Sequence, residues 1–269
     1  MRLSLDFVTI GELGTKDFLR VNKNDSISGV IKEMSKEGVD RALVYSDDEP
    51  EGIVTKKDIV SRVGSSRRRR IPPSSLHVSS FMSFPLLILP EDILISKAAR
   101  VMLDAGISSI PAHRDREVIS LFSKWDIAKV LIKEASPIED IMSRKVVWIM
   151  EDDSLIKARK LMVEEGLSTL PVMNADGKVI GIVTVTELMD ALIEILDVLA
   201  ESGARNALKR IRVGEIMRPL IPSLRPDDTI GMAAALMIEK SIRGVLVMNE
   251  EGDLEGLVTL TDLTRFVVK

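Results

Sequence analysis

The chain has 269 residues, of which 45% are hydrophobic and 29% are charged, so it can supply the cores of a globular protein. Its 37 basic and 41 acidic side chains nearly balance, which gives no reason to expect nucleic acid as a partner. The absence of cysteine excludes disulfides, thiolate metal sites and cysteine nucleophiles, and no stretch is apolar enough to span a membrane. We expect a soluble, cytoplasmic protein.

Four repeats follow one another along the chain, each opening with a similar short segment that we call its start. Three starts read apolar-x-x-apolar-Met and end at Met82, Met142 and Met217, and the degenerate first one ends at Gly14. A second methionine comes 20 residues after each start, and an acidic residue comes 44 or 45 residues after it. Such constant spacing identifies internal repeats. These methionines are Met34, Met102, Met162 and Met237, and the acids are Asp58, Asp126, Glu187 and Asp262.

Each repeat predicts the same order of elements after its start, as the third repeat illustrates. Residues Leu155, Ala158 and Met162 fall on one face, which predicts an amphipathic helix that ends at Gly166. Short apolar runs then flank a turn at residues 174–177, which predicts a β-hairpin that leads into a second helix. The fold class is therefore α+β, and the repeats should pack in pairs because so small a sheet cannot bury its own apolar face.

The spacing also predicts where the repeats begin and end. Pairing consecutive repeats divides the chain into a first pair at 1–134 and a second pair at 135–269. The predicted repeats span about 8–63, 76–133, 136–200 and 211–269.

The hairpins end in a shared motif, Gly-apolar-apolar-Thr/Ser-x-x-acid. It reads GIVTKKD from Gly52, SLFSKWD from Ser120, GIVTVTE from Gly181 and GLVTLTD from Gly256. A hydroxyl three residues before an acid can simply cap a helix. Alternatively, the carboxylate can accept hydrogen bonds from two adjacent ribose hydroxyls, while the helix N-terminus attracts phosphate. Capping alone does not require the glycine, which favours a ligand site.

On these motifs, together with the strands GISSIPA from Gly106 and GLSTLPV from Gly166, the four units resemble CBS (cystathionine-β-synthase) domains. The resemblance covers about Val8 to Phe266 and leaves no room for a catalytic domain. It implies four tandem β-α-β-β-α repeats packed as two pairs, with clefts that hold AMP, ADP, ATP or S-adenosyl compounds as regulatory ligands. Four repeats in one chain are similar to the gamma subunit of AMP-activated protein kinase and to free-standing prokaryotic CBS proteins, which implies energy sensing without enzymatic activity.

The resemblance also implies which residues contact the ligand. Glu187 departs from the family's aspartate, so its site should be empty or structural, and Ser120 replaces a glycine and should crowd its cleft. A basic residue before the middle strand is expected to meet phosphate, and lysines such as Lys124 should be solvated. The ribose-binding pairs are Thr55 with Asp58, Ser123 with Asp126, Thr259 with Asp262 and Thr184 with Glu187, and the phosphate-binding candidates are Arg41, Arg243 and Lys56.

One alternative and several partners stay open at this stage. The basic run Arg67–Arg70 fits a solvated loop, but a nucleic-acid-associated or structural scaffold with vestigial clefts would use it for contacts. His77 and His113 lack the spacing of a metal site, so no metal is expected. Hydrolytic catalysis is also not expected, because no histidine accompanies the Ser, Thr and Asp residues. A homodimer and an unidentified protein target remain open as partners.

Overall fold

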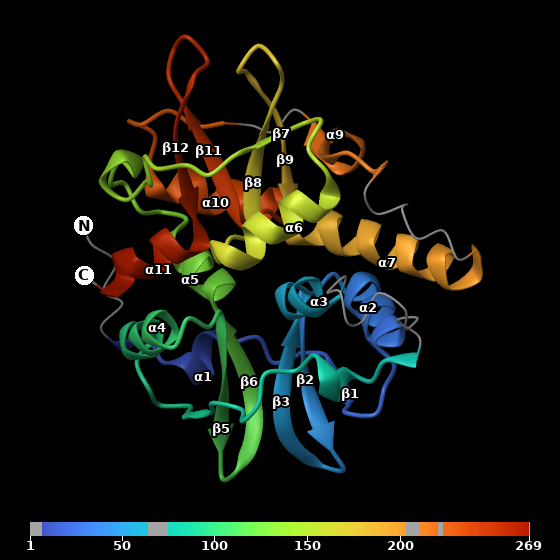
Figure 1. The fold of residues 1–269 in the computed structure, drawn as a ribbon. Coiled ribbons are helices and arrows are strands. Elements are labelled where there is room, and N and C mark those ends of the chain that lie inside the picture. The colour runs from blue at the N-terminus through green and yellow to red at the C-terminus, as the bar shows by residue number, and fades with distance from the viewer. Residues whose placement is uncertain (1–6, 64–74, 203–209, 220–222, 269) are drawn as a thin grey trace. The chain divides into compact units, whose positions relative to one another are not determined.

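The computed structural model describes residues 7–63, 75–202, 210–219 and 223–268, without the side chains of residues 196–202 (Figure 1). Arg67–Arg70, on which the scaffold alternative depends, lies outside the described residues. Within the described part, all four repeats show the predicted helix, hairpin and second helix. The predicted α+β class is therefore confirmed.

The first two repeats have the same succession of elements. In each, a short helical turn precedes a short strand, a longer helix, a hairpin and a second helix (Figure 1). The first repeat consists of α1 (Ile10–Leu13), β1 (Arg20–Asn22), α2 (Ile27–Lys36), β2 (Arg41–Ser46), β3 (Glu49–Thr55) and α3 (Lys56–Arg62). The second consists of η3 (Val78–Ser80), β4 (Leu89–Pro90), α4 (Ile95–Asp104), β5 (Ser109–Arg114), β6 (Glu117–Ser123) and α5 (Lys124–Leu131).

The last two repeats follow the same plan with three differences. The second helix of the third repeat is longer than its counterparts. In the fourth repeat the short strand is reduced to a single bridge between Leu224 and Val247, and an added strand, β10, pairs with β9 of the third repeat. The third repeat consists of η4 (Ile138–Asp140), β7 (Ile149–Met150), α6 (Leu155–Glu164), β8 (Thr169–Met173), β9 (Val179–Thr184) and α7 (Val185–Ser202). The fourth consists of α9 (Val213–Ile216), β10 (Arg218–Pro219), α10 (Ile230–Lys240), β11 (Gly244–Met248), β12 (Leu254–Thr259) and α11 (Leu260–Val268).

Local sequence explains the ends of the first long helix of each repeat. Gly38, Gly106 and Gly166 follow these helices with φ angles of 65°, 66° and 68°, a left-handed conformation that glycine adopts without strain. Ser241 takes the same conformation in the fourth repeat, with φ of 53°. The predicted C-terminal glycine caps are therefore confirmed. The recurring methionines of these helices are buried core residues, as their spacing predicts: Met34, Met102, Met162 and Met237.

The chain forms two compact units, and each contains the first long helix, hairpin and second helix of one repeat from either half of the sequence. Unit 1 comprises Met1–Phe18, Leu87–Val146 and Ile221–Lys269, and unit 2 comprises Leu19–Leu86 and Val147–Leu220. In unit 2 one apolar core runs through the first and third repeats, including Met34, Ile59, Met162 and Leu188. Since each unit draws on both halves of the chain, the pairing of consecutive repeats stays a prediction.

The start of each repeat packs against the hairpin of the neighbouring repeat in the sequence. Ser83, which directly follows the second start, bridges Ile53 of the first hairpin, and Arg218, which directly follows the fourth start, pairs with Ile182 of the third hairpin. A Cβ atom on Gly52 would lie 2.9 Å from Met82 Sδ, and one on Gly181 would lie 2.4 Å from the Arg218 carbonyl oxygen. The motif glycine thus has a packing role, so its presence does not by itself indicate a ligand.

Ser120 and Gly14, the two departures from the repeat pattern, compensate one another. A Cβ atom on Gly14 would lie 2.7 Å from Ser120 Oγ, whereas each of the three glycines of the motif has a methionine of a start close by. Ser120 is fully buried, and its hydroxyl donates to the carbonyl oxygen of Ile10 at 3.4 Å. The serine therefore occupies space that the missing methionine leaves, and it faces the first start. This contact gives no support to the expectation that it crowds a ligand cleft.

Candidate functional site

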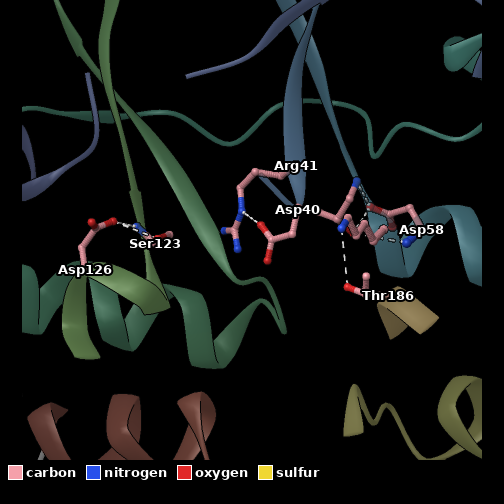
Figure 2. A network of polar contacts seen from close by, with 8 residues as sticks. Asp40, Arg41, Asp58, Ser123, Asp126 and Thr186 are labelled. Carbon is pink, nitrogen blue, oxygen red and sulfur yellow. Dashed lines mark hydrogen bonds and ion pairs between the residues drawn. The ribbon is translucent and has the colours of Figure 1, made fainter. Parts of the chain in front are cut away.

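All four Thr/Ser-x-x-acid motifs cap the second helix of their repeat. In the first repeat, Thr55 donates from its backbone N–H and its hydroxyl to Asp58 Oδ2, at 2.9 and 2.6 Å (Figure 2). Asp58 N–H donates back to Thr55 Oγ1 at 3.2 Å. The hydroxyl and one carboxylate oxygen of the motif are thus engaged in a capping box. The same acid-to-hydroxyl contact joins Ser123 to Asp126, Thr184 to Glu187 and Thr259 to Asp262.

The second carboxylate oxygen distinguishes the four motifs. Among the described residues, no hydrogen bond or ion pair reaches Asp58 Oδ1. In contrast, Lys129 Nζ lies 2.9 Å from Asp126 Oδ1, and Arg265 Nη1 lies 2.8 Å from Asp262 Oδ1. Both partners belong to the same helix as the acid. Asp58 is therefore the acid whose outer oxygen is open to an external donor.

The third repeat pairs its acid in a different way. Arg218, in β10, donates from Nε to Glu187 Oε1, while Glu187 Oε2 accepts from Thr184. Both carboxylate oxygens of Glu187 are thus occupied by partners within the protein. Arg218 could not be singled out from the sequence, because only the pairing of β10 with β9 brings it to Glu187.

The candidate phosphate residues Arg41 and Arg243 lie one position apart when the first and fourth repeats are aligned. Arg41 opens β2, is 5% exposed, and pairs in the hairpin with Thr55, whereas Arg243 precedes β11. Arg41 Nε donates to Asp40 Oδ1 at 2.7 Å (Figure 2). Burial lowers the pKa of Arg243 to about 10, so its guanidinium is still charged at neutral pH. It lies 5.9 Å from the centre of the Trp125 ring, a cation–π distance.

Two lysines at helix starts reach a threonine of another repeat in the same unit. In unit 2, Lys56 Nζ lies 3.5 Å from Thr186 Oγ1 (Figure 2). In unit 1, Lys124 Nζ donates to Thr261 Oγ1 at 3.1 Å. Burial lowers the pKa of Lys56, and Asp190 partly offsets this effect. Lys124 is only 8% exposed, so the expectation that it is an ordinary solvated lysine is wrong, because the opposing helix covers it.

Arg159 is a positioning residue that the sequence did not indicate. From α6 its Nε donates to the carbonyl oxygens of Val60 and Val63, both at 2.8 Å, and its Nη2 donates to Ser61. These carbonyls lie in the last turn of α3 or just beyond it, where helical partners are lacking. Arg159 therefore holds the helix that carries Asp58 at its other end.

Two kinds of feature are missing from the described residues. Within them no group of three His, Cys, Asp or Glu side chains is placed to hold a metal ion. No helix in the described ranges is long and apolar enough to cross a membrane.

A family model for the CBS domain matches residues 10–65, 78–133, 138–194 and 213–269. The chain belongs to the CBS-domain family. The four matched ranges cover most of the sequence and agree with the four predicted repeats, which confirms the resemblance stated on the sequence. Each contains one of the capped acids described above.

Individual relatives extend this assignment. MJ1404 of Methanocaldococcus jannaschii, an uncharacterized protein, is 26% identical over 282 residues, covering 99% of this chain and 63% of the relative. A homoserine O-acetyltransferase of Methanohalobium evestigatum is 35% identical over 122 residues, which are 45% of this chain and 25% of the enzyme. The chain thus spans a quarter of that enzyme.

Among solved structures, MJ1225 of Methanocaldococcus jannaschii has the same fold, with a TM-score of 0.85 at 22% identity. The match covers 96% of this chain and 99% of MJ1225, which is described as a candidate archaeal homologue of g-AMPK. A second chain of similar length therefore adopts this fold.

Proposed function

We propose that the chain is a regulatory protein without catalytic activity that binds an adenosine-containing ligand through its Thr/Ser-x-x-acid motifs. The outer oxygen of Asp58 carries this proposal. A charged acceptor without a donor among the described residues gains most when an external donor reaches it. Adjacent ribose hydroxyls are donors of this kind, and they are the groups that the family resemblance implies.

The charges near the first repeat favour a phosphorylated ligand. Arg41 pairs with Thr55 in the hairpin, and Lys56 directly follows Thr55, so two cations accompany the Asp58 motif. We propose AMP, ADP or ATP as the ligand of this repeat, with Arg41 and Lys56 as phosphate contacts. Arg243 would serve the fourth repeat in the same way, and S-adenosyl compounds suit motifs without these cations.

Ligand binding would then report the adenine nucleotide level to a partner. We propose energy sensing as the role, with a protein target or a second copy of the chain as the receiver. Among the proposed ribose pairs, Thr55 with Asp58 ranks first. Thr259 with Asp262 and Ser123 with Asp126 rank below it, because a ligand must first displace an exposed basic side chain from each of these two acids.

Ligand release and thermal stabilisation test this proposal. We expect the natively purified protein to release an adenosine compound on denaturation, which mass spectrometry would identify. Added ligand at 100 times its dissociation constant should stabilise the fold by about 2.7 kcal/mol per site. If AMP, ADP, ATP, S-adenosylmethionine and methylthioadenosine all leave the melting temperature unchanged at millimolar concentration, the proposal is wrong.

A further inference from the structure

The third repeat differs from the others at two positions that meet in the structure. One is its acid, which is Glu187 where the other repeats have aspartate. The other is Arg218, which directly follows the fourth start and pairs with the hairpin of the third repeat. At the positions equivalent to Arg218, the other hairpins receive small hydroxyl residues, which are Thr15, Ser83 and Ser143. The longer carboxylate, Glu187, and the long basic side chain, Arg218, thus occur together and form an ion pair.

The base of the Arg218–Glu187 ion pair is less exposed than the bases that pair with Asp126 and Asp262. Lys129 and Arg265 are 52% and 62% exposed and come from the same helix as their acids, so either can swing into solvent. Arg218 is 37% exposed, and its partner Glu187 is 13% exposed. The backbone of Arg218 is fixed by strand pairing with Ile182. Displacing its guanidinium therefore requires the rotation of a less solvated side chain than Lys129 or Arg265.

From this geometry, and resting on the proposed ribose-binding role of these acids, we infer that Arg218 closes the third repeat to ligand by taking the place of the ribose hydroxyls. Its guanidinium supplies an N–H donor to Glu187 Oε1, the oxygen equivalent to the open Oδ1 of Asp58. Thr184 saturates the other oxygen. Arg218 is thus the residue that excludes ligand from the third repeat.

Reopening the site tests this inference. The double variant Arg218→Ser, Glu187→Asp reproduces the Ser83 and Asp58 of the first repeat in the third. We expect it to bind one more adenosine per chain than the wild type, counted by equilibrium dialysis, because adenosine needs the ribose contact but no phosphate contact. Arg225→Ser removes a different Arg–Glu pair, that of Arg225 with Glu250, and should leave the count unchanged.

Two further measurements keep the result decisive. Circular dichroism melting shows whether the double variant folds, and if it does not, Arg218→Ser alone, which retains the Glu187 cap, should still gain adenosine binding. An unchanged adenosine count in a folded variant overturns the inference. A wild type that binds no adenosine contradicts the proposed ligand instead, and even then a gain in the variant supports the role of Arg218.

Discussion

Replacing Asp58 by alanine is expected to weaken AMP binding at the first repeat by roughly 10-fold to 150-fold, as a lost hydrogen bond to a charged group predicts. The reason is that Asp58 Oδ1 has no hydrogen bond or ion pair within the described ranges, so its binding capacity remains for the ligand. Isothermal titration calorimetry measures the change directly. The fold should survive, because loss of a capping contact costs about 1 kcal/mol.

Glu187→Ala is the matched control for this experiment. It removes the acid of an equivalent cap, but one whose outer oxygen is already paired with Arg218. We expect AMP affinity to change by less than about twofold, which corresponds to a few tenths of a kcal/mol. Normal AMP binding by Asp58→Ala, combined with lost binding in Glu187→Ala, would show that the motif of the first repeat is only a cap.

Replacing Arg159 by methionine is expected to lower the free energy of unfolding by about 2 to 3 kcal/mol, since charged hydrogen bonds to three carbonyl groups disappear. The methionine keeps much of the apolar volume of the side chain, so the loss reports mainly on these bonds. Urea unfolding followed by circular dichroism measures it. Nucleotide binding at Asp58 should weaken as well, because Val60, Ser61 and Val63 lie at the far end of the same helix.

Arg100→Met provides the comparison for Arg159. Arg100 donates from Nη2 to the carbonyl oxygen of Val268 at 3.2 Å, and it is exposed. Its loss should cost well under about 1 kcal/mol, as is usual for exposed contacts. Equal destabilisation by the two substitutions would mean that the three carbonyl contacts of Arg159 contribute nothing beyond side-chain packing.

The repeats could be predicted from the sequence because their signals are local. A glycine after a helix, a methionine on its apolar face, and a hydroxyl three residues before an acid each reflect interactions within a few residues. The caps at Thr55 and Thr259 and the left-handed Gly38 and Gly106 are examples. Because these signals recur in four copies at constant spacing, the sequence is sufficient to indicate the family.

The features that distinguish one repeat from another could not be predicted, because they arise between distant segments. Arg218 meets Glu187 across 31 residues, and Arg159 meets Val60 across 99. The motif glycine favours a ligand site when only the sequence is considered, whereas Gly52 and Gly181 also make room for a start from the neighbouring repeat. The sequence predicts a solvated Lys124, because Thr261, whose helix covers this lysine in the structure, lies 137 residues further along the chain.

The structure of this protein with bound AMP tests the central claim most directly. We expect both ribose hydroxyls at the first repeat to lie near Asp58, with at least one donating to Oδ1, while the Arg218–Glu187 pair stays intact. Arg41 or Lys56 should contact the phosphate. AMP bound away from Asp58, or a ribose on Glu187 with Arg218 displaced, would contradict this account.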